Sequence, residues 1–365
     1  MQIIFVSSIT SGGSGLSQRQ LARRLSERGH GVEIISASPN SRIVRPLYLR
    51  EVDLSTRFRS SVLRPALLAV QRPMGQRIHR VDTPDYPTWF SAVPENGYRS
   101  LRARQRPDVV VANSIGRITW RRLRAQLRAT NIPSVLYLRE IAGLGHLSVT
   151  KAPPDLLLAN ADSIAQAARG LGYECSVVPS VVELDRSKTY PSREAVVLVN
   201  PIPLLGGDRL WPLARARPDI PFIVFESGSM SETERDAVRA ELADHPNVTL
   251  EPFSNNPSDI YRRAKILLVP HRVDNRPRVV LEAQSNGIPV LASAFPGLEE
   301  SVGAGGVLVE NDADSSGWID ALSRMWDDPN LYQSLVDAAL LQAARPETDC
   351  EAIVERFEQL LGAIL

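Results

Sequence analysis

Short apolar runs rich in β-branched residues alternate with helical patterns along almost the whole chain, and this alternation limits what the chain can fold into. Six runs in the first half begin at Ile3, Val32, Asp108, Ser134, Leu156 and Ser176. Six more in the second half begin at Ala195, Phe222, Val248, Ile266, Pro289 and Gly306. Continuous apolar strands suit a parallel sheet covered by helices on both faces. The pattern therefore predicts an α/β protein built from doubly wound, Rossmann-like units.

The length predicts two such units. A chain of 365 residues, 43% of them hydrophobic, is about twice as long as a typical domain and can fill two cores. The polar stretch 183–194 differs in composition from both flanks and is the expected linker. We expect an N-terminal domain at 1–185, a C-terminal domain at 186–349, and a final helix at 350–365 that crosses back to the first domain.

Two capping patterns predict where helices begin. Ser17 with Gln20 predicts the start of a helix that Gly29 ends. Ser231 with Glu234 predicts the start of another, ending near Asp244. The glycine-rich segment 8–16 is then expected to be a loop between the first strand and the first helix.

The formal charge of +1 is the sum of two unlike halves. Residues 1–185 hold 25 basic and 14 acidic side chains, and the remainder holds 17 and 27, giving net charges of +11 and −10. Nine arginines lie between Arg42 and Arg80, which suits a phosphate, an anionic lipid or nucleic acid, or simply a solvated basic face. Nucleic acid is not expected, because a recognition motif and interleaved aromatic residues are missing. The apolar stretch 62–70 fits either an amphipathic membrane contact or a buried helix.

Cysteine usage and hydropathy predict a cytoplasmic protein. The two cysteines, Cys175 and Cys350, make no disulfide framework, and no stretch reaches the 18 apolar residues of a membrane span. The first residues lack the features of a signal peptide. Peripheral contact with an anionic membrane, at the inner face of the cell membrane, is the further expectation from the basic segment.

The glycine loop after the first strand is a candidate phosphate or acceptor site. Gly12, Gly13, Ser14 and Gly15 let a ligand approach backbone N–H groups at a helix N-terminus. A dinucleotide fingerprint is incomplete, because Gln18 stands where its third glycine belongs and the second strand ends without an acidic residue. An NAD-dependent oxidoreductase is therefore the weaker alternative, and a tight turn without a ligand also stays open.

The segment 269–293 carries the most specific pattern. A strand ends at Pro270, a polar loop follows, a helix begins near Arg278 and ends at Gly287, and another strand begins at Pro289. Asp274 and Glu282 are separated by seven residues and are followed by Ala283 and by the sequence GIPV at 287–290. This combination resembles the family-4 (group 1) retaining glycosyltransferases.

The resemblance implies a GT-B fold, in which two Rossmann-like domains face each other across a cleft. It implies transfer of a sugar from a nucleoside-diphosphate sugar, without metal or other cofactor, to a glycan, lipid-linked or small-molecule acceptor. Asp274 and Glu282 would be the catalytic pair, with Glu282 also accepting hydrogen bonds from the ribose and Asp274 contacting the donor sugar. The backbone N–H groups of Asn275 and Arg276 would face the diphosphate.

Three departures from the family pattern concern the diphosphate. Asn275-Arg276-Pro277 replaces Gly-Phe-Gly, Asp274 replaces Glu, and Asn200 and Leu205 stand at the positions of a basic pair. The missing charge is expected from Arg276, Arg278, Arg209 or Arg139. The alternative is a catalytically weak or silent homologue that binds a nucleotide sugar or a partner glycosyltransferase.

The remaining candidates belong to the acceptor side or have simpler explanations. Arg139 and His146 follow a strand of the first domain and are candidate acceptor contacts, as the glycine loop is, although His146 and His271 are also typical of packing histidines. Asp312 and Asp314 match a D-x-D metal pattern, but carboxylates before a helix expected at 315–328 are explained by capping. We therefore expect no metal site.

Overall fold

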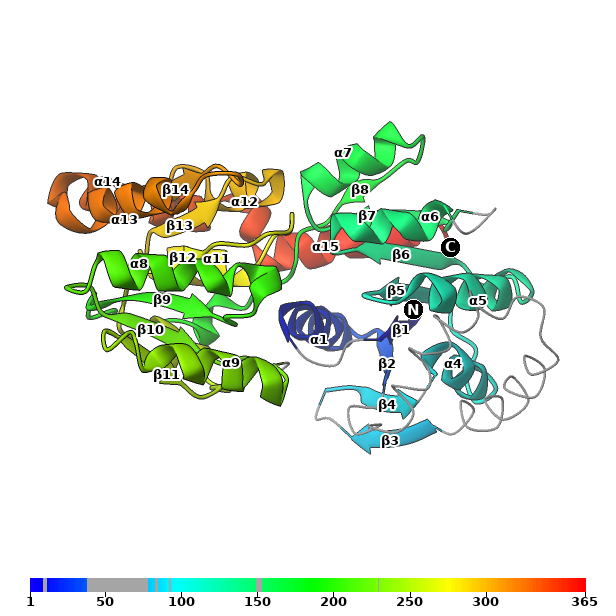
Figure 1. Cartoon of the computed structure of the whole chain (residues 1–365). Coiled ribbons are helices and arrows are strands. Elements are labelled where there is room, and N and C mark those ends of the chain that lie inside the picture. Colours follow the sequence, from blue (N-terminus) through cyan, green and yellow to red (C-terminus); the bar gives the residue numbers. More distant parts are fainter. Residues whose placement is uncertain (9–11, 38–77, 83–84, 92, 149–152, 229) are drawn as a thin grey trace. The chain divides into compact units, whose positions relative to one another are not determined.

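The computed structural model describes residues 1–8, 12–37, 78–82, 85–91, 93–148, 153–228 and 230–365. These residues form two compact units (Figure 1). Unit 1 consists of Met1–Asn160, Ile164–Val178 and Val354–Leu365, and unit 2 of Ala161–Ser163 and Pro179–Ile353. The chain therefore enters unit 2 shortly before the expected boundary at 185 and returns to unit 1 within its last helix.

Unit 1 is built on a sheet in the order β3-β4-β2-β1-β5-β6-β7-β8. Its described strands are β1 (Gln2–Ser7), β2 (Gly31–Ala37), β3 (Ile78–Asp82), β4 (Pro87–Ser91), β5 (Val109–Asn113), β6 (Ser134–Leu138), β7 (Leu156–Ala159) and β8 (Ser176–Val177). All neighbours pair in parallel except β3 and β4. The parallel core strands are those that the apolar runs predict. β3 and β4 were not expected, because their alternating composition lies inside the arginine-rich and aromatic segment.

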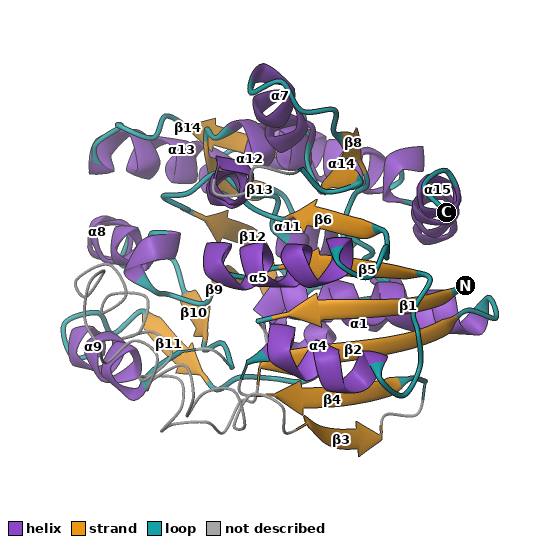
Figure 2. Cartoon of the chain, turned by 90° about the vertical axis from the view of Figure 1, so that its right-hand side faces the viewer, coloured by secondary structure: helices purple, strands orange, loops and turns teal. Residues whose placement is uncertain are grey.

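Helices cover both faces of this sheet, and Figure 2 shows α4 and α5 in front of the strands with α1 behind them. The described helices of unit 1 are α1 (Gly12–Glu27), α4 (Pro94–Arg102), α5 (Arg117–Arg128), the short η1 (Ile141–Leu144) and α6 (Gly145–Ser148), and α7 (Asp162–Gly170). The two-sided cover explains why strands such as β1 and β5 are apolar throughout.

The last helix, α15 (Cys350–Gly362), packs on unit 1. The Phe357 ring is fully buried and lies 6.3 Å from the ring centroids of Phe5 and Tyr137, which belong to β1 and β6. The Glu358 carboxylate accepts hydrogen bonds from His30 (2.7 Å) and Arg28 (3.1 Å). Aromatic packing and these charged hydrogen bonds attach the end of the chain to the unit in which it begins.

The first helix begins earlier than its capping pattern predicts. α1 starts at Gly12, so Ser17 and Gln20 lie buried inside the helix and the predicted start at Ser17 is wrong. Gly12 has a φ of +77°, which only glycine adopts readily, and Gly15 is buried. Gly12 and Gly13 are exposed, whereas Gly15, Ser17 and Gln18 are buried, so packing from Gly15 onward outweighs the low helix propensity of glycine. The segments 42–77 and 62–70, which carry the membrane expectation, lie outside the described residues.

Unit 2 is built on an all-parallel sheet in the order β11-β10-β9-β12-β13-β14. Its strands are β9 (Ala195–Val199), β10 (Phe222–Phe225), β11 (Val248–Glu251), β12 (Ala264–Val269), β13 (Val290–Ser293) and β14 (Gly306–Val309). Its helices are α8 (Leu210–Ala216), α9 (Glu232–Leu242), α10 (Pro257–Tyr261), α11 (Arg278–Gln284), α12 (Pro296–Val302), α13 (Ser315–Asp327) and α14 (Pro329–Ala343). Short 3₁₀ turns lie at η2 (Leu184–Arg186), η3 (Pro203–Leu205), η4 (Gly207–Arg209) and η5 (Pro346–Thr348).

Alternate residues of β9 enter two separate cores. Val196 and Leu198 pack with Trp318 on one face of the sheet, and Ala195 and Val197 pack with Tyr261 on the other. Successive side chains of a strand point to opposite faces, so an unbroken apolar run can serve both. The doubly wound fold predicted for the second half is confirmed.

Two predicted helix caps of unit 2 are present. Ser231 and Glu234 form a capping box at the start of α9, as predicted. The Asp314 carboxylate caps α13 by accepting from the backbone N–H groups of Ser316 and Gly317. Asp314 therefore has the capping role that was expected in place of metal binding. None of the described helices is long and apolar enough to cross a membrane.

Candidate functional site

The predicted donor residues lie at the carboxyl edge of the unit 2 sheet. Asp274 follows β12, Glu282 lies on α11, and Arg209 ends the turn η4 after β9. Parallel strands place the loops that follow them at one edge, which is where open α/β sheets bind ligands. The topology therefore gathers side chains that are far apart in the sequence.

Glu282 is buried and held by two side chains. Only 4% of the residue is exposed; its Oε2 accepts a hydrogen bond from the Tyr261 hydroxyl at 2.6 Å, and its Oε1 accepts from Arg278 Nε at 2.7 Å. Burial, followed by the neighbouring Glu282 charge, raises the pKa of the Tyr261 hydroxyl well above its ordinary value, so Tyr261 stays a donor. The carboxylate is fixed from α10 and from the first turn of its own helix.

Asp274 is fixed by the first turn of α12. Its Oδ1 accepts a hydrogen bond from the backbone N–H of Gly297 at 2.8 Å. A Cβ atom at position 297 would lie 2.8 Å from this same oxygen and 2.8 Å from the carbonyl oxygen of Asn275. Glycine is therefore required at 297 for the loop to approach α12, a role that the sequence did not reveal.

Asn275 is tied to a buried histidine. The Asn275 Oδ1 atom lies 2.9 Å from Nδ1 of His271, which is 6% exposed. Burial lowers the pKa of His271 below 6.5, and the hydrogen bond to Asn275 opposes that shift. His271 is thus a buried side chain that holds the loop 270–277 in place through Asn275, which agrees with the packing role considered for it.

Both arginines expected at the diphosphate are ion-paired in the structure. Arg276 Nη1 lies 2.8 Å from Oε1 of Glu300, and Arg278 pairs with Glu282. Glu300 also accepts from the backbone N–H of Asp162 at 2.9 Å. The Arg278–Glu282 pair has i, i+4 spacing, so the sequence contains a signal from which this pair could have been predicted. Arg276 and Arg278 were expected to neutralise the diphosphate, but in the structure a carboxylate already neutralises each guanidinium.

Arg209 has a different environment. Its Nη1 donates to the Ser293 hydroxyl at 3.2 Å and its Nη2 to the Asn311 carbonyl at 2.8 Å, and its guanidinium lies 5.0 Å from the ring centroid of Trp318. Burial, with a contribution from nearby Arg272, lowers the pKa of Arg209, and the Asp208 carboxylate opposes that shift without forming an ion pair with Arg209. Within the described ranges no carboxylate forms an ion pair with Arg209. The Arg209 guanidinium, at the ends of β13 and β14, donates hydrogen bonds only to two neutral acceptors, a hydroxyl and a carbonyl.

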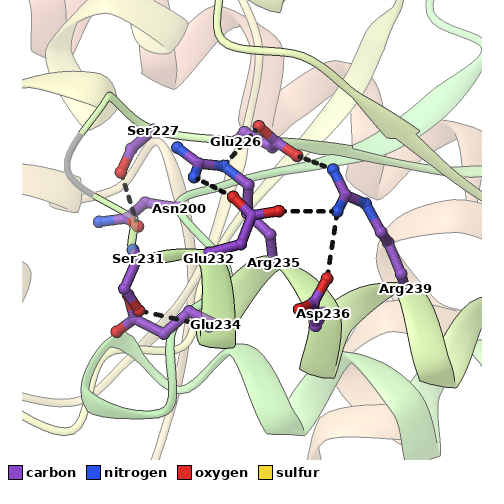
Figure 3. A network of polar contacts seen from close by, with 9 residues as sticks. All are labelled: Asn200, Glu226, Ser227, Ser231, Glu232, Glu234, Arg235, Asp236 and Arg239. Carbon is purple, nitrogen blue, oxygen red and sulfur yellow. Dashed lines mark hydrogen bonds and ion pairs between the residues drawn. The ribbon is translucent and has the colours of Figure 1, made fainter.

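Asn200 belongs to a polar network after β9 and β10, shown in Figure 3. Asn200 has a φ of +62°, and its Oδ1 accepts a hydrogen bond from the Ser227 hydroxyl at 2.9 Å. Beside it, Glu226 accepts from Arg235 Nε at 3.0 Å. The network anchors the loop between β10 and α9 next to Asn200.

Leu205, at the place of the expected lysine, lies in a closely packed turn. Gly206 has a φ of +70°, and a Cβ atom there would lie 1.8 Å from the carbonyl oxygen of Pro270. The turn after β9 therefore presses against the end of β12. This packing fixes the backbone that leads to Arg209.

The candidates in unit 1 lie at the carboxyl edge of its own sheet. The predicted glycine segment, Gly12, Gly13, Ser14 and Gly15, forms the first turn of α1, and the Ser14 hydroxyl lies 2.5 Å from the Ser114 hydroxyl after β5. The ring nitrogens of His146 face the carbonyl oxygens of Gly143 and Ile115. Arg139 is 7% exposed, with its guanidinium 3.9 Å from the Tyr137 ring centroid. These contacts give His146 and Arg139 packing partners within the unit.

The comparisons with known proteins agree with this architecture. Residues 208–328 match the family model of glycosyl transferases group 1. D-inositol 3-phosphate glycosyltransferase 1 of Catenulispora acidiphila is 34% identical over 131 residues, 33% of this chain and 31% of that protein. The D-inositol 3-phosphate glycosyltransferase of Corynebacterium urealyticum is 31% identical over 155 residues, 39% of this chain and 36% of that protein. The matched region thus spans about a third of the length of these curated relatives.

Solved structures match the chain over its whole length. Sucrose-phosphate synthase of Thermosynechococcus elongatus has a TM-score of 0.75 at 16% identity, covering 100% of this chain and 99% of that one. HepE of Anabaena, crystallised with UDP and glucose, has a TM-score of 0.75 at 14% identity and covers 100% of both chains. At such identities the likeness concerns the fold. The chain therefore has the GT-B fold and carries, in its second unit, the sequence signature of the group 1 glycosyltransferases.

Proposed function

We propose that the protein is a retaining glycosyltransferase that moves a sugar from a nucleoside-diphosphate sugar to an acceptor hydroxyl. The observation that carries this proposal is the pair Asp274 and Glu282. Seven residues separate them, they lie at the carboxyl edge of a parallel sheet, and they fall inside the region matched by the group 1 model. HepE was crystallised with UDP and with UDP-glucose, which makes a UDP-sugar the first donor to test.

Glu282 is the proposed ribose-binding residue. A carboxylate can accept about four hydrogen bonds, and Tyr261 and Arg278 occupy one on each oxygen. The remaining capacity suits two neighbouring hydroxyl groups. Because the residue is 4% exposed, we infer that the nucleoside reaches it through a small movement of the loop 270–277.

Arg209 is the proposed cation for the diphosphate. Arg276 and Arg278 are neutralised by Glu300 and Glu282, whereas Arg209 bonds only to a hydroxyl and a carbonyl. A guanidinium binds phosphate through two parallel hydrogen bonds and keeps its charge when buried. Asn200 and the backbone N–H groups of Asn275 and Arg276 complete the proposed donor site.

The proposed reaction uses no nucleophile from the protein. The acceptor oxygen bonds to the anomeric carbon as the bond from that carbon to the phosphate oxygen breaks, and the acceptor proton passes to the leaving diphosphate. Arg209 stabilises the negative charge that develops on the diphosphate. Asp274, held by Gly297, positions the donor sugar. No metal is required, so a chelator should leave the rate unchanged.

We propose that the acceptor binds to unit 1, and we specify only its chemical class. The glycine turn Gly12–Gly15, Arg139 and His146 are the proposed acceptor or phosphate contacts. The curated relatives are named for D-inositol 3-phosphate, so a phosphorylated small molecule is one acceptor to test, beside glycans and lipid-linked acceptors. The expected location is the cytoplasm.

The test is binding followed by turnover. Thermal unfolding with UDP, GDP, ADP or TDP should show one nucleotide that raises the melting temperature, because a ligand of the native state stabilises it. Arg209→Ala should weaken diphosphate binding about tenfold to a hundredfold, the equivalent of a charged hydrogen bond. Arg215→Ala, an exposed arginine on α8, is the matched control and should bind as the wild type does. Equal affinity of both variants would contradict the role of Arg209.

The second candidate is a silent homologue that binds a nucleotide sugar or a partner glycosyltransferase. The two ion-paired arginines and Leu205 favour it, because they remove cations that a leaving diphosphate needs. Slow hydrolysis of the matching nucleotide sugar separates the two functions. Nucleotide binding without hydrolysis would favour the silent homologue, and binding of NAD instead would favour the oxidoreductase alternative.

A further inference from the structure

Helices α4 and α5 carry a dense group of arginines on one face of unit 1. Between residues 94 and 128 the sequence holds nine arginines against two acidic residues, Glu95 and Asp108. The two helices lie together on the same face of the sheet (Figure 2). Gln126 Nε2 donates to the Glu95 carbonyl at 2.9 Å and Arg122 Nη1 lies 3.4 Å from Glu95 Oε1, so the helices pack directly.

The acidic groups near these helices are already engaged. Glu95 is fully buried and pairs with Arg122. Asp155 pairs with Arg124 at 3.1 Å and also accepts from the backbone N–H of Ser134 at 2.8 Å. Asp108 accepts from the backbone N–H of Gln2 at 2.6 Å. Asp108 and Asp155 remain exposed near Arg106 and Arg128, at one end of the helices. Within α4 and α5 themselves the one acidic side chain, Glu95, is buried, so the helices expose no negative charge of their own.

The exposed arginines of this surface form what we call the arginine face, which consists of Arg99, Arg106, Arg117, Arg121 and Arg128. In the part of the chain that the structure describes, none of the five forms an ion pair. Arg117, Arg121 and Arg128 follow one stripe of α5, which extends about 16 Å at 1.5 Å per residue. The large hydrophobic residues that are exposed in the described chain all lie outside α4 and α5.

We propose that the arginine face binds the surface of a bilayer that contains anionic phospholipid. Several cations spread over two adjacent helices match a planar array of phosphate groups, and guanidinium groups bind phosphate through paired hydrogen bonds. The described residues of α4 and α5 expose no aromatic ring on which bases could stack, which disfavours single-stranded nucleic acid. Without an apolar side chain to insert, the binding is electrostatic and weakens with salt. The proposal does not depend on glycosyl transfer.

The test compares vesicles of phosphatidylcholine alone with vesicles that also contain phosphatidylglycerol, in flotation assays at low and high salt. The full chain should float only with phosphatidylglycerol and mainly at low salt. The variant Arg99→Gln/Arg121→Gln/Arg128→Gln should bind roughly a hundredfold more weakly, since each basic residue near an anionic surface contributes about fivefold in affinity.

A matched control removes the same charge from unit 2. Arg215→Gln/Arg262→Gln/Arg263→Gln replaces three exposed arginines and should float as the wild type does. Circular dichroism and thermal unfolding verify that both variants are folded. Equal vesicle binding by the two variants, or no preference of the wild type for phosphatidylglycerol, would overturn the proposal. If the same three arginines bound an oligonucleotide more tightly than vesicles, the partner of this face would be nucleic acid and not a membrane.

Discussion

The two units place their arginines in opposite ways. In unit 2, Arg276 and Arg278 are paired with Glu300 and Glu282 at the edge where the candidate site lies. In unit 1, Arg122 and Arg124 of α5 are paired as well, but Arg99, Arg117, Arg121 and Arg128 are exposed and form no ion pair among the described residues. The polar candidates at the sheet edge bond to hydroxyls and backbone carbonyls. Paired charges fix the geometry of a buried site, whereas unpaired charges remain available to a partner. The arginines at the unit 2 site therefore hold a site in place, whereas the exposed arginines of unit 1 are available to bind a partner.

The largest effect should come from removing the buried carboxylate of unit 2. Glu282→Gln leaves the Arg278 guanidinium, whose side chain is 8% exposed, without its charged partner. We expect a loss of about 3 kcal/mol in the free energy of unfolding. Nucleotide affinity should fall at least about tenfold, because a charged acceptor is lost. Urea unfolding and calorimetric titration measure the two effects.

The matched variant in unit 1 is Glu95→Gln. Glu95 is also fully buried and pairs with an arginine, but it lies between α4 and α5. It should lower stability and leave nucleotide affinity unchanged. If Glu95→Gln weakened nucleotide binding as much as Glu282→Gln does, the contrast between the units would be wrong.

Gly297→Ala tests the contact that fixes Asp274. The new methyl group would lie 2.8 Å from the Asn275 carbonyl oxygen and from Asp274 Oδ1, so the loop must move. We expect a loss of about 1–3 kcal/mol in the free energy of unfolding and a lower kcat for donor hydrolysis. Gly317→Ala, whose methyl would have its nearest neighbour at 3.5 Å inside α13, should be neutral or stabilising by up to about 1 kcal/mol. An active, stable Gly297→Ala enzyme would contradict the role given to this contact.

Tyr261→Phe should have a smaller effect, and it separates positioning from packing. The variant removes the hydroxyl that donates to Glu282 and keeps the ring. We expect a loss of about 1–2 kcal/mol in stability and a several-fold rise in the Kd for nucleotide. The control is Tyr332→Phe, which removes a hydroxyl that donates to the Lys265 carbonyl at 3.1 Å. Its nucleotide Kd should not change, and a rise equal to that of Tyr261→Phe would indicate a general loss of rigidity.

The smallest effect concerns pH. The pKa of His271 is lowered by burial below 6.5, so the unfolded chain binds a proton more readily than the folded protein does. The free energy of unfolding should therefore fall as the pH drops below 6.5 towards the pKa of the folded state. His271→Gln should reduce this pH dependence. Urea unfolding of both proteins at neutral and mildly acidic pH measures the difference, and parallel pH profiles would exclude His271 as its source.

Part of the candidate site could be predicted from local patterns. The spacing of Asp274 and Glu282 placed both on a loop and helix after a strand, and the structure has them there. Contacts between distant segments could not be predicted in this way. Tyr261 bonds to Glu282 across 21 positions, and Gly297 bonds to Asp274 across 23. Such pairs form only when the loops of neighbouring parallel strands meet at one edge.

By itself, the sequence determined the two doubly wound units and the strands at their centres, because continuous apolar runs are stable only in a parallel sheet covered on both faces. It also determined the seven-residue spacing of the two carboxylates and the basic character of the first half. The tertiary structure decided which charges are neutralised. A side chain finds its partner only after folding sets its neighbours, so Arg278 pairs with Glu282 while Arg209 keeps neutral partners. Packing likewise decided that α1 begins before Ser17, since burial of Gly15, Ser17 and Gln18 outweighs local propensity.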